Sequence, residues 1–78
     1  MSKVSIVLPY NIAGFLPDEI VVWLDTYVGE VINSHKSCAV GLGWCLRRVE
    51  NTGFNVTEIY TFEIDDPTKA MLFKLTFG

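Results

Sequence analysis

Three carboxylates close together in the second half of the chain are the first candidates for chemistry. Glu63, Asp65 and Asp66 lie within one short segment, and Glu58 comes shortly before them. Carboxylate oxygens are the preferred ligands of hard cations such as Ca2+ and Mg2+. However, Asp66 is followed by Pro67, and this pair is typical of a helix start with the aspartate as cap. We therefore interpret the group as a helix cap and a solvated strand end, and predict no metal site.

The single histidine, His35, is followed by the two cysteines of the chain, Cys38 and Cys45. Zinc sites usually have a tetrahedral ligand set with paired cysteines about two to four residues apart, which this spacing does not provide. A cysteine beside a histidine can also act as an activated nucleophile. We expect reduced thiols and an exposed histidine near a helix end instead. The sequence thus predicts no catalytic residue and no cofactor.

Glycines and arginines form a third group that could bind anions. The segment Gly41-Leu42-Gly43 lacks the lysine and hydroxyl ending of a phosphate-binding loop and leads into a strand, so we predict a turn. Arg47 and Arg48 follow, and a guanidinium can bind a phosphate or carboxylate through two parallel hydrogen bonds. Alternation along a strand places the two on opposite faces, so we expect no joint clamp. One of them is expected to pair with Glu58 or Glu63 across a hairpin.

Two periodic segments in the first half must position these residues. Residues 3–10 alternate between apolar and other side chains, which predicts a strand in which Pro9 marks either the end or an edge position. Residues 17–33 carry apolar side chains on one side at helical spacing, with Asp18 in the first turn. This pattern predicts one long amphipathic helix. Within it, Gly29 would permit close approach to the sheet.

The second half predicts a β-hairpin. Residues 44–50 form its first strand, whose buried face we leave open, and residues 51–53 form the loop. The second strand covers residues 54–64, in which every second side chain except Glu58 is large and apolar. The apolar set is Phe54, Val56, Tyr60, Phe62 and Ile64. This period of two predicts that the set faces the core.

Glu58 is the exception on that apolar face. A carboxylate buried under a helix would need a partner, such as Arg48 or Tyr10. We favour the alternative that Glu58 lies at the fringe of the sheet, near the turn, and reaches water. After Asp66 the pattern predicts a second helix, which either continues to about Leu75 or stops near Phe73 before a short last strand over residues 74–77.

The predicted element order is β-α-β-β-α within a single domain of residues 1–78, with a possible short fourth strand. This is the order of the ferredoxin-like split βαβ fold, an antiparallel sheet with both helices on one face. The first and third predicted strands would lie side by side. The other sheet face would be semi-apolar and free for contacts. Its candidate interface residues are Val7, Cys45, Arg47, Val49, Thr57, Ile59, Thr61 and Glu63.

Composition narrows the class of function. Half of the 78 residues are hydrophobic, and so small a domain hides only about 60–65% of its unfolded surface, so we expect a homodimer to cover the remainder. The formal net charge of −3 argues against binding nucleic acid, which depends on neutralisation of phosphates. No apolar run approaches the length of a membrane span, and the first residues lack a signal-peptide pattern. We expect a cytoplasmic protein without a membrane partner.

The last quarter of the chain carries a resemblance. The segment YTFEIDDPTKAMLFKLTFG resembles the end of small uncharacterised accessory proteins of tailed bacteriophages. The matching residues are Phe62, Asp66, Pro67, Ala70, Leu72, Phe73, Lys74, Leu75, Phe77 and Gly78. The resemblance implies no activity. It implies an accessory protein that acts by binding in the host cytoplasm.

We therefore predict a non-enzymatic binding protein, a homodimer whose partner is a host protein. The alternative is a protein that binds or sequesters a small ligand such as a nucleotide or metabolite. A second alternative is a small enzyme that uses His35 or the acidic group.

Overall fold

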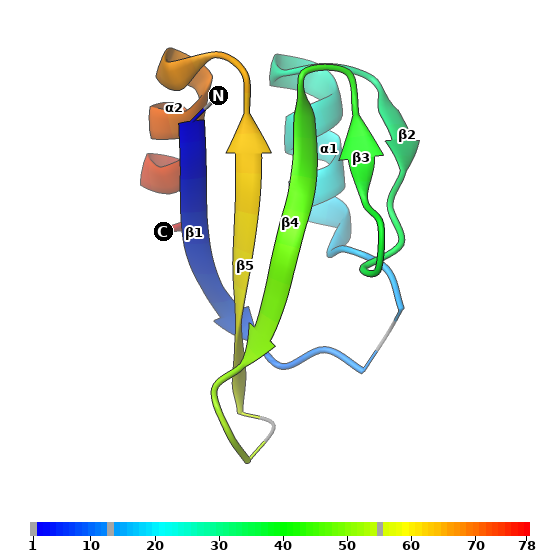
Figure 1. The fold of residues 1–78 in the computed structure, drawn as a ribbon, viewed down its shortest axis with the longest axis vertical. Helices are drawn as coiled ribbons and strands as arrows, with labels where there is room; N and C mark the ends of the chain where they lie inside the picture. Colours follow the sequence, from blue (N-terminus) through cyan, green and yellow to red (C-terminus); the bar gives the residue numbers. More distant parts are fainter. Residues whose placement is uncertain (1, 13, 55) are drawn as a thin grey trace.

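Two helices pack on one face of a five-stranded antiparallel sheet in the computed structural model, which describes residues 2–12, 14–54 and 56–78 (Figure 1). The strands lie side by side in the order β1-β5-β4-β3-β2, and every neighbouring pair is antiparallel. The elements in chain order are β1 (Ser2–Pro9), α1 (Asp18–Tyr27), β2 (Val31–Asn33), β3 (Val40–Gly41), β4 (Trp44–Asn51), β5 (Thr57–Ile64) and α2 (Pro67–Phe77).

The α+β class, the antiparallel sheet and the placement of both helices on one face are confirmed (Figure 1). The first strand also lies beside the long strand near the C-terminus, as predicted. The ferredoxin-like order and strand count are wrong. Two short strands, β2 and β3, extend the sheet beyond β4, and α2 occupies the segment where a last strand was considered.

The helix predicted over residues 17–33 ends at Tyr27. Its end is fixed by packing at Gly29, where an added Cβ would lie 1.9 Å from the carbonyl oxygen of Leu42. Gly29 therefore does allow a close approach, as predicted, and the segment that it approaches is the turn between β3 and β4. Beyond it, Val31–Asn33 leaves the helix and forms β2 with β-branched residues that suit a strand.

The second hairpin strand begins later than predicted. It starts at Thr57, whose carbonyl oxygen accepts a hydrogen bond from the Thr52 amide 3.2 Å away and closes the loop. Phe54 has a φ of 59° and is 99% exposed, and Val56 is exposed as well. The prediction that Phe54 and Val56 face the core is therefore wrong, because the loop turns the chain before it extends. Asn55, within the predicted strand, lies outside the described residues.

The second helix is continuous through Phe77, which answers the question left open for residues 74–77. Its start follows the predicted capping, because an oxygen of the Asp66 carboxylate accepts a hydrogen bond from the Thr68 amide at 2.8 Å. Phe73 is fully buried, and its ring packs edge-on against Phe62 of β5 with centroids 5.0 Å apart. The helix is thus anchored to the sheet through an aromatic contact.

The core lies between the sheet and the helices. It takes alternate residues of β1 and β5 and the inner sides of α1 and α2. Its buried hydrophobic members are Val4, Ile6, Leu16, Ile20, Leu24, Ala39, Trp44, Tyr60, Phe62, Ile64, Ala70 and Phe73. The period of two predicted for β5 is confirmed from Tyr60 to Ile64, since all three positions of that set are fully buried.

Candidate functional site

The sheet face opposite the helices, here called the outer face, is left uncovered by both helices (Figure 1). The strand register arranges its side chains in rows across β1, β5 and β4. The first row is Lys3, Glu63 and Cys45, the second is Ser5, Thr61 and Arg48, and the third is Val7, Ile59 and Glu50. Most of the predicted interface residues therefore do share one face.

A β-bulge in β4 changes the facing of the residues that follow it. Leu46 pairs with Phe62 and Arg48 with Thr61, so Arg47 is the extra residue between them. Beyond the bulge, Val49 pairs with buried Tyr60 and packs against the core. Its assignment to the outer face is therefore wrong.

The same bulge brings the two arginines together on the outer face. Arg47 Nε lies 3.0 Å from Glu63 Oε1, and Arg48 Nε lies 3.0 Å from Glu50 Oε1. Both carboxylates belong to outer-face rows, so the prediction that alternation separates the arginines is wrong. The predicted pairing with Glu63 across the hairpin is confirmed for Arg47.

Two hollows adjoin the arginines. The first, of about 400 Å³, lies on the outer face and is lined by Lys3, Ser5 and Thr61 in addition to both arginines. The second, of about 480 Å³, follows the edge of β4 where β3 has ended. Besides the arginines it is lined by His35, Lys36, Ser37, Leu46, Val49 and Glu58. Lys3, Ser5 and Lys36 were missing from the predicted set.

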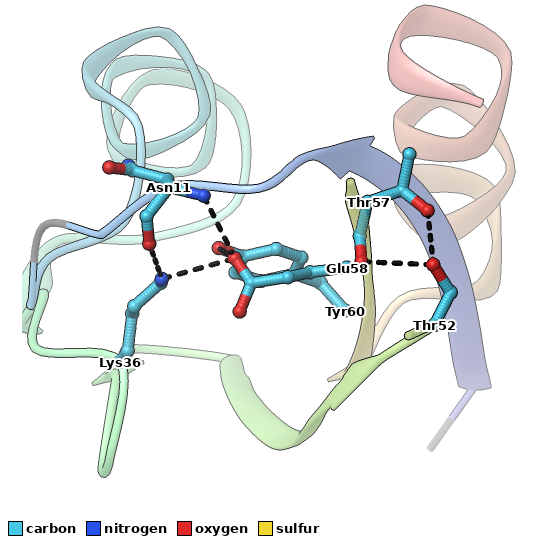
Figure 2. A network of polar contacts seen from close by, with 6 residues as sticks. All are labelled: Asn11, Lys36, Thr52, Thr57, Glu58 and Tyr60. Carbon is cyan, nitrogen blue, oxygen red and sulfur yellow. Dashed lines mark hydrogen bonds and ion pairs between the residues drawn. The ribbon is translucent and has the colours of Figure 1, made fainter. Parts of the chain in front are cut away.

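Glu58 is buried and paired, so its expected place in water at the fringe of the sheet is wrong. The residue is 7% exposed, and its Oε1 lies 3.1 Å from Lys36 Nζ (Figure 2). The same oxygen accepts hydrogen bonds from Tyr60 Oη at 3.1 Å and the Asn11 amide at 3.3 Å. Lys36 Nζ also donates to the Asn11 carbonyl. The ion-pair partner of Glu58 is thus Lys36, whereas Arg48 and Tyr10 were predicted as its possible partners.

The pKa values of this network follow from that geometry. Burial by itself raises the pKa of the Glu58 carboxyl, but hydrogen bonds from Lys36, the Asn11 amide and Tyr60 outweigh it and hold the pKa below its ordinary 4.5. Burial lowers the pKa of Lys36, but its bonds to Glu58 and Tyr60 outweigh that effect and raise it above 10.5. Both groups are therefore charged at neutral pH, as a structural ion pair requires.

Of the residues offered for metal or nucleophilic chemistry, His35 and Cys38 both contact the Ser37 hydroxyl, whereas Cys45 lies elsewhere. His35 Nδ1 lies 2.7 Å from Ser37 Oγ, whereas Cys38 Sγ accepts from Asn33 Nδ2 at 2.9 Å. Cys45 lies on the outer face, and both thiols are free. In the described part of the chain, no group of three His, Cys, Asp or Glu residues could hold a metal ion.

Comparison of the chain with known proteins found no relative. No family model, no curated protein and no solved structure matches the chain. The resemblance to bacteriophage accessory proteins stays a prediction. No helix in residues 2–12, 14–54 or 56–78 has the length and apolar character needed to cross a membrane.

Proposed function

We propose that the chain is a non-enzymatic binding protein whose recognition surface is the outer face of the sheet. The observation that supports this is the one-sided packing of the fold. Both described helices cover the same face (Figure 1), and the core residues of β1 and β5 are buried in one cluster with residues of these helices. Three long strands thus present their remaining side chains to solvent, and uncovered sheet faces of this kind are used for association.

The occupant we propose for the third row is a second copy of the chain, which makes the protein a homodimer. Val7 is 57% exposed, and Ile59 lies beside it at partial exposure, so the row has an apolar centre. Glu50, the third member of the row, already pairs with Arg48 of the second row. Two identical rows can therefore meet without burying an unpaired charge, which would otherwise oppose association.

The edge of β1 is a less favourable binding surface for a second copy of the chain. The Lys74 ammonium of α2 donates a hydrogen bond to the carbonyl of Ser5 at 2.6 Å, so part of the edge backbone is already occupied. A lysine placed along an edge strand is a common way in which proteins block pairing between sheets. In the third row of the outer face, the charged member is Glu50, which Arg48 neutralises.

The test is the oligomeric state of the wild type and of Ile59→Asp, measured by size-exclusion chromatography with light scattering. We expect a dimer for the wild type and a monomer for the variant, because a carboxylate would be buried in the contact. Met71→Asp adds the same charge to an exposed position on α2 and should remain dimeric. Circular dichroism should show all three folded.

A wild-type monomer at high micromolar concentration would overturn the homodimer. If that monomer captured a bacterial host protein and Ile59→Asp did not, the partner of the row would be a host protein instead. Loss of folded structure in Ile59→Asp would show that this side chain supports the fold.

A further inference from the structure

The bulge in β4 creates a paired arginine surface that the proposed dimer contact does not explain. Arg47 and Arg48 each bond a carboxylate through Nε, and their side chains are 58% and 67% exposed. Glu63 is the described ion-pair partner of Arg47, and Glu50 is that of Arg48. Because a guanidinium has five N–H donors and both groups are largely exposed, each can also donate to an anion from solvent.

Basic residues are concentrated around this pair although the protein is acidic. Four of the six lysines and arginines of the chain line the two hollows, together with the single histidine. Lys36 forms an ion pair with Glu58, whereas Lys3 lines the first hollow beside the arginines. Three of these four cations pair with Glu58, Glu63 and Glu50, so four positive and three negative charges meet in this part of the acidic protein.

The first hollow also offers hydroxyl groups. Ser5 Oγ and Thr61 Oγ1 lie 3.0 Å apart in the second row of the outer face, next to Arg48 in the register. A hydroxyl can rotate its proton toward an oxygen of a ligand. Glu63 and Glu50 compete for the arginines, but exposed ion pairs contribute little to stability and yield readily to a better-placed anion.

The second hollow differs in chemistry from the first. Leu46 and Val49 give it apolar walls, and His35 adds an aromatic ring. Because Arg47 and Arg48 line both hollows, one ligand can reach across them. A volume of about 480 Å³ lies within the range of about 300–1,000 Å³ usual for small-molecule sites.

We propose that Arg47, Arg48 and Lys3 bind the phosphoryl group of a small phosphate monoester, whose organic part lies along β4 in the second hollow. A nucleoside monophosphate has this chemistry. A longer polyanion fits less well, because the remaining surface is acidic and would repel further phosphates. Arg48 of this site also pairs with Glu50 of the third row, so the experiment includes a monomeric variant that distinguishes the two proposals.

The experiment is an NMR titration of the full chain with adenosine monophosphate, inorganic phosphate and adenosine. We expect adenosine monophosphate to shift the amide signals of Ser5, Thr61 and Arg48 and to bind more tightly than either fragment. Arg47→Gln and Arg48→Gln should each weaken binding about tenfold, as loss of a charge-assisted hydrogen bond predicts. Lys69→Gln removes a cation that lines neither hollow and should leave binding unchanged.

Several outcomes would overturn the proposal. These are the absence of saturable shifts at millimolar ligand, equal binding of adenosine and its monophosphate, and equal weakening by Lys69→Gln. Tighter binding of a single-stranded oligonucleotide would replace the small ligand with nucleic acid. Repeating the titration on Ile59→Asp separates this site from the dimer contact, since a monomer that still binds supports the site alone.

Discussion

Glu58 Oε1 lies 3.1 Å from Lys36 Nζ, and this ion pair joins β5 to the loop between β2 and β3. The side chains are 9% and 16% exposed, so the pair is largely removed from water. Asn11 contributes its amide to Glu58 and its carbonyl to Lys36, which ties the segment after β1 into the same network (Figure 2). Three stretches that are distant in sequence are therefore held together at one end of the sheet.

Removing one member of this pair should destabilise the protein more than removing both. Glu58→Leu leaves the Lys36 ammonium without its carboxylate, and we expect a loss of about 3 kcal/mol in the free energy of unfolding. The double variant Lys36→Met with Glu58→Leu should recover most of that loss, because no buried charge is left unpaired. Urea denaturation measures both values. As a control, Arg48→Gln breaks an exposed pair and should cost no more than about 1 kcal/mol.

The pair should also give stability a dependence on acidic pH. The folded-state pKa of Glu58 is lowered below 4.5, so its contribution is complete above that value and is lost as pH falls through the folded pKa. Wild-type stability should therefore drop below pH 4.5 more steeply than that of the double variant. Urea midpoints measured over a pH series test this. Parallel curves would show that Glu58 has the same pKa in the folded and unfolded states.

The parts of the fold that depend on local pattern could be predicted from the sequence. The alternation of Tyr60, Phe62 and Ile64 fixes their face because successive side chains of a strand point to opposite sides. The end of α1 could not be predicted in the same way. Val31 continues the apolar side of the helical pattern, and the contact that stops the helix joins Gly29 to Leu42, far along the chain.

The candidate site was predicted where alternation holds and missed where it breaks. Ile59 and Thr61 lie on the expected face, whereas the bulge at Arg47 reverses the facing of Val49. A bulge inserts one unpaired residue, and nothing in the residue types at this point marks it. Lys36 was missed because it lies in a loop 22 residues from Glu58, beyond the reach of any strand or helix period.

Phe54 occupies a position that suits a smaller residue. Its φ of 59° lies in the left-handed region, which costs a bulky residue about 1–2 kcal/mol, and its exposed ring contributes no core contact. Phe54→Asn should therefore stabilise the protein by about 1 kcal/mol, because asparagine tolerates this conformation. Thermal unfolding measures the change. Phe62→Ala serves as the matched core control and should cost about 3–5 kcal/mol. A loss of stability in Phe54→Asn would show that this ring packs in solution.

Gly29 should tolerate no side chain, because the end of α1 meets the turn after β3 there. An added Cβ would lie 1.9 Å from the Leu42 carbonyl oxygen, a backbone atom that moves only if the turn moves. The Gly29 carbonyl also accepts the indole hydrogen bond of buried Trp44 at 3.1 Å, so a shift here would disturb the core. We expect Gly29→Ala to cost about 3 kcal/mol or more in urea denaturation. Gly14→Ala is the matched control, because its Cβ would meet only the His35 side chain, at 3.2 Å. This variant should change the free energy of unfolding by no more than about 1 kcal/mol.

Equal stability of the two variants would mean that α1 and the turn separate more readily than their packing indicates.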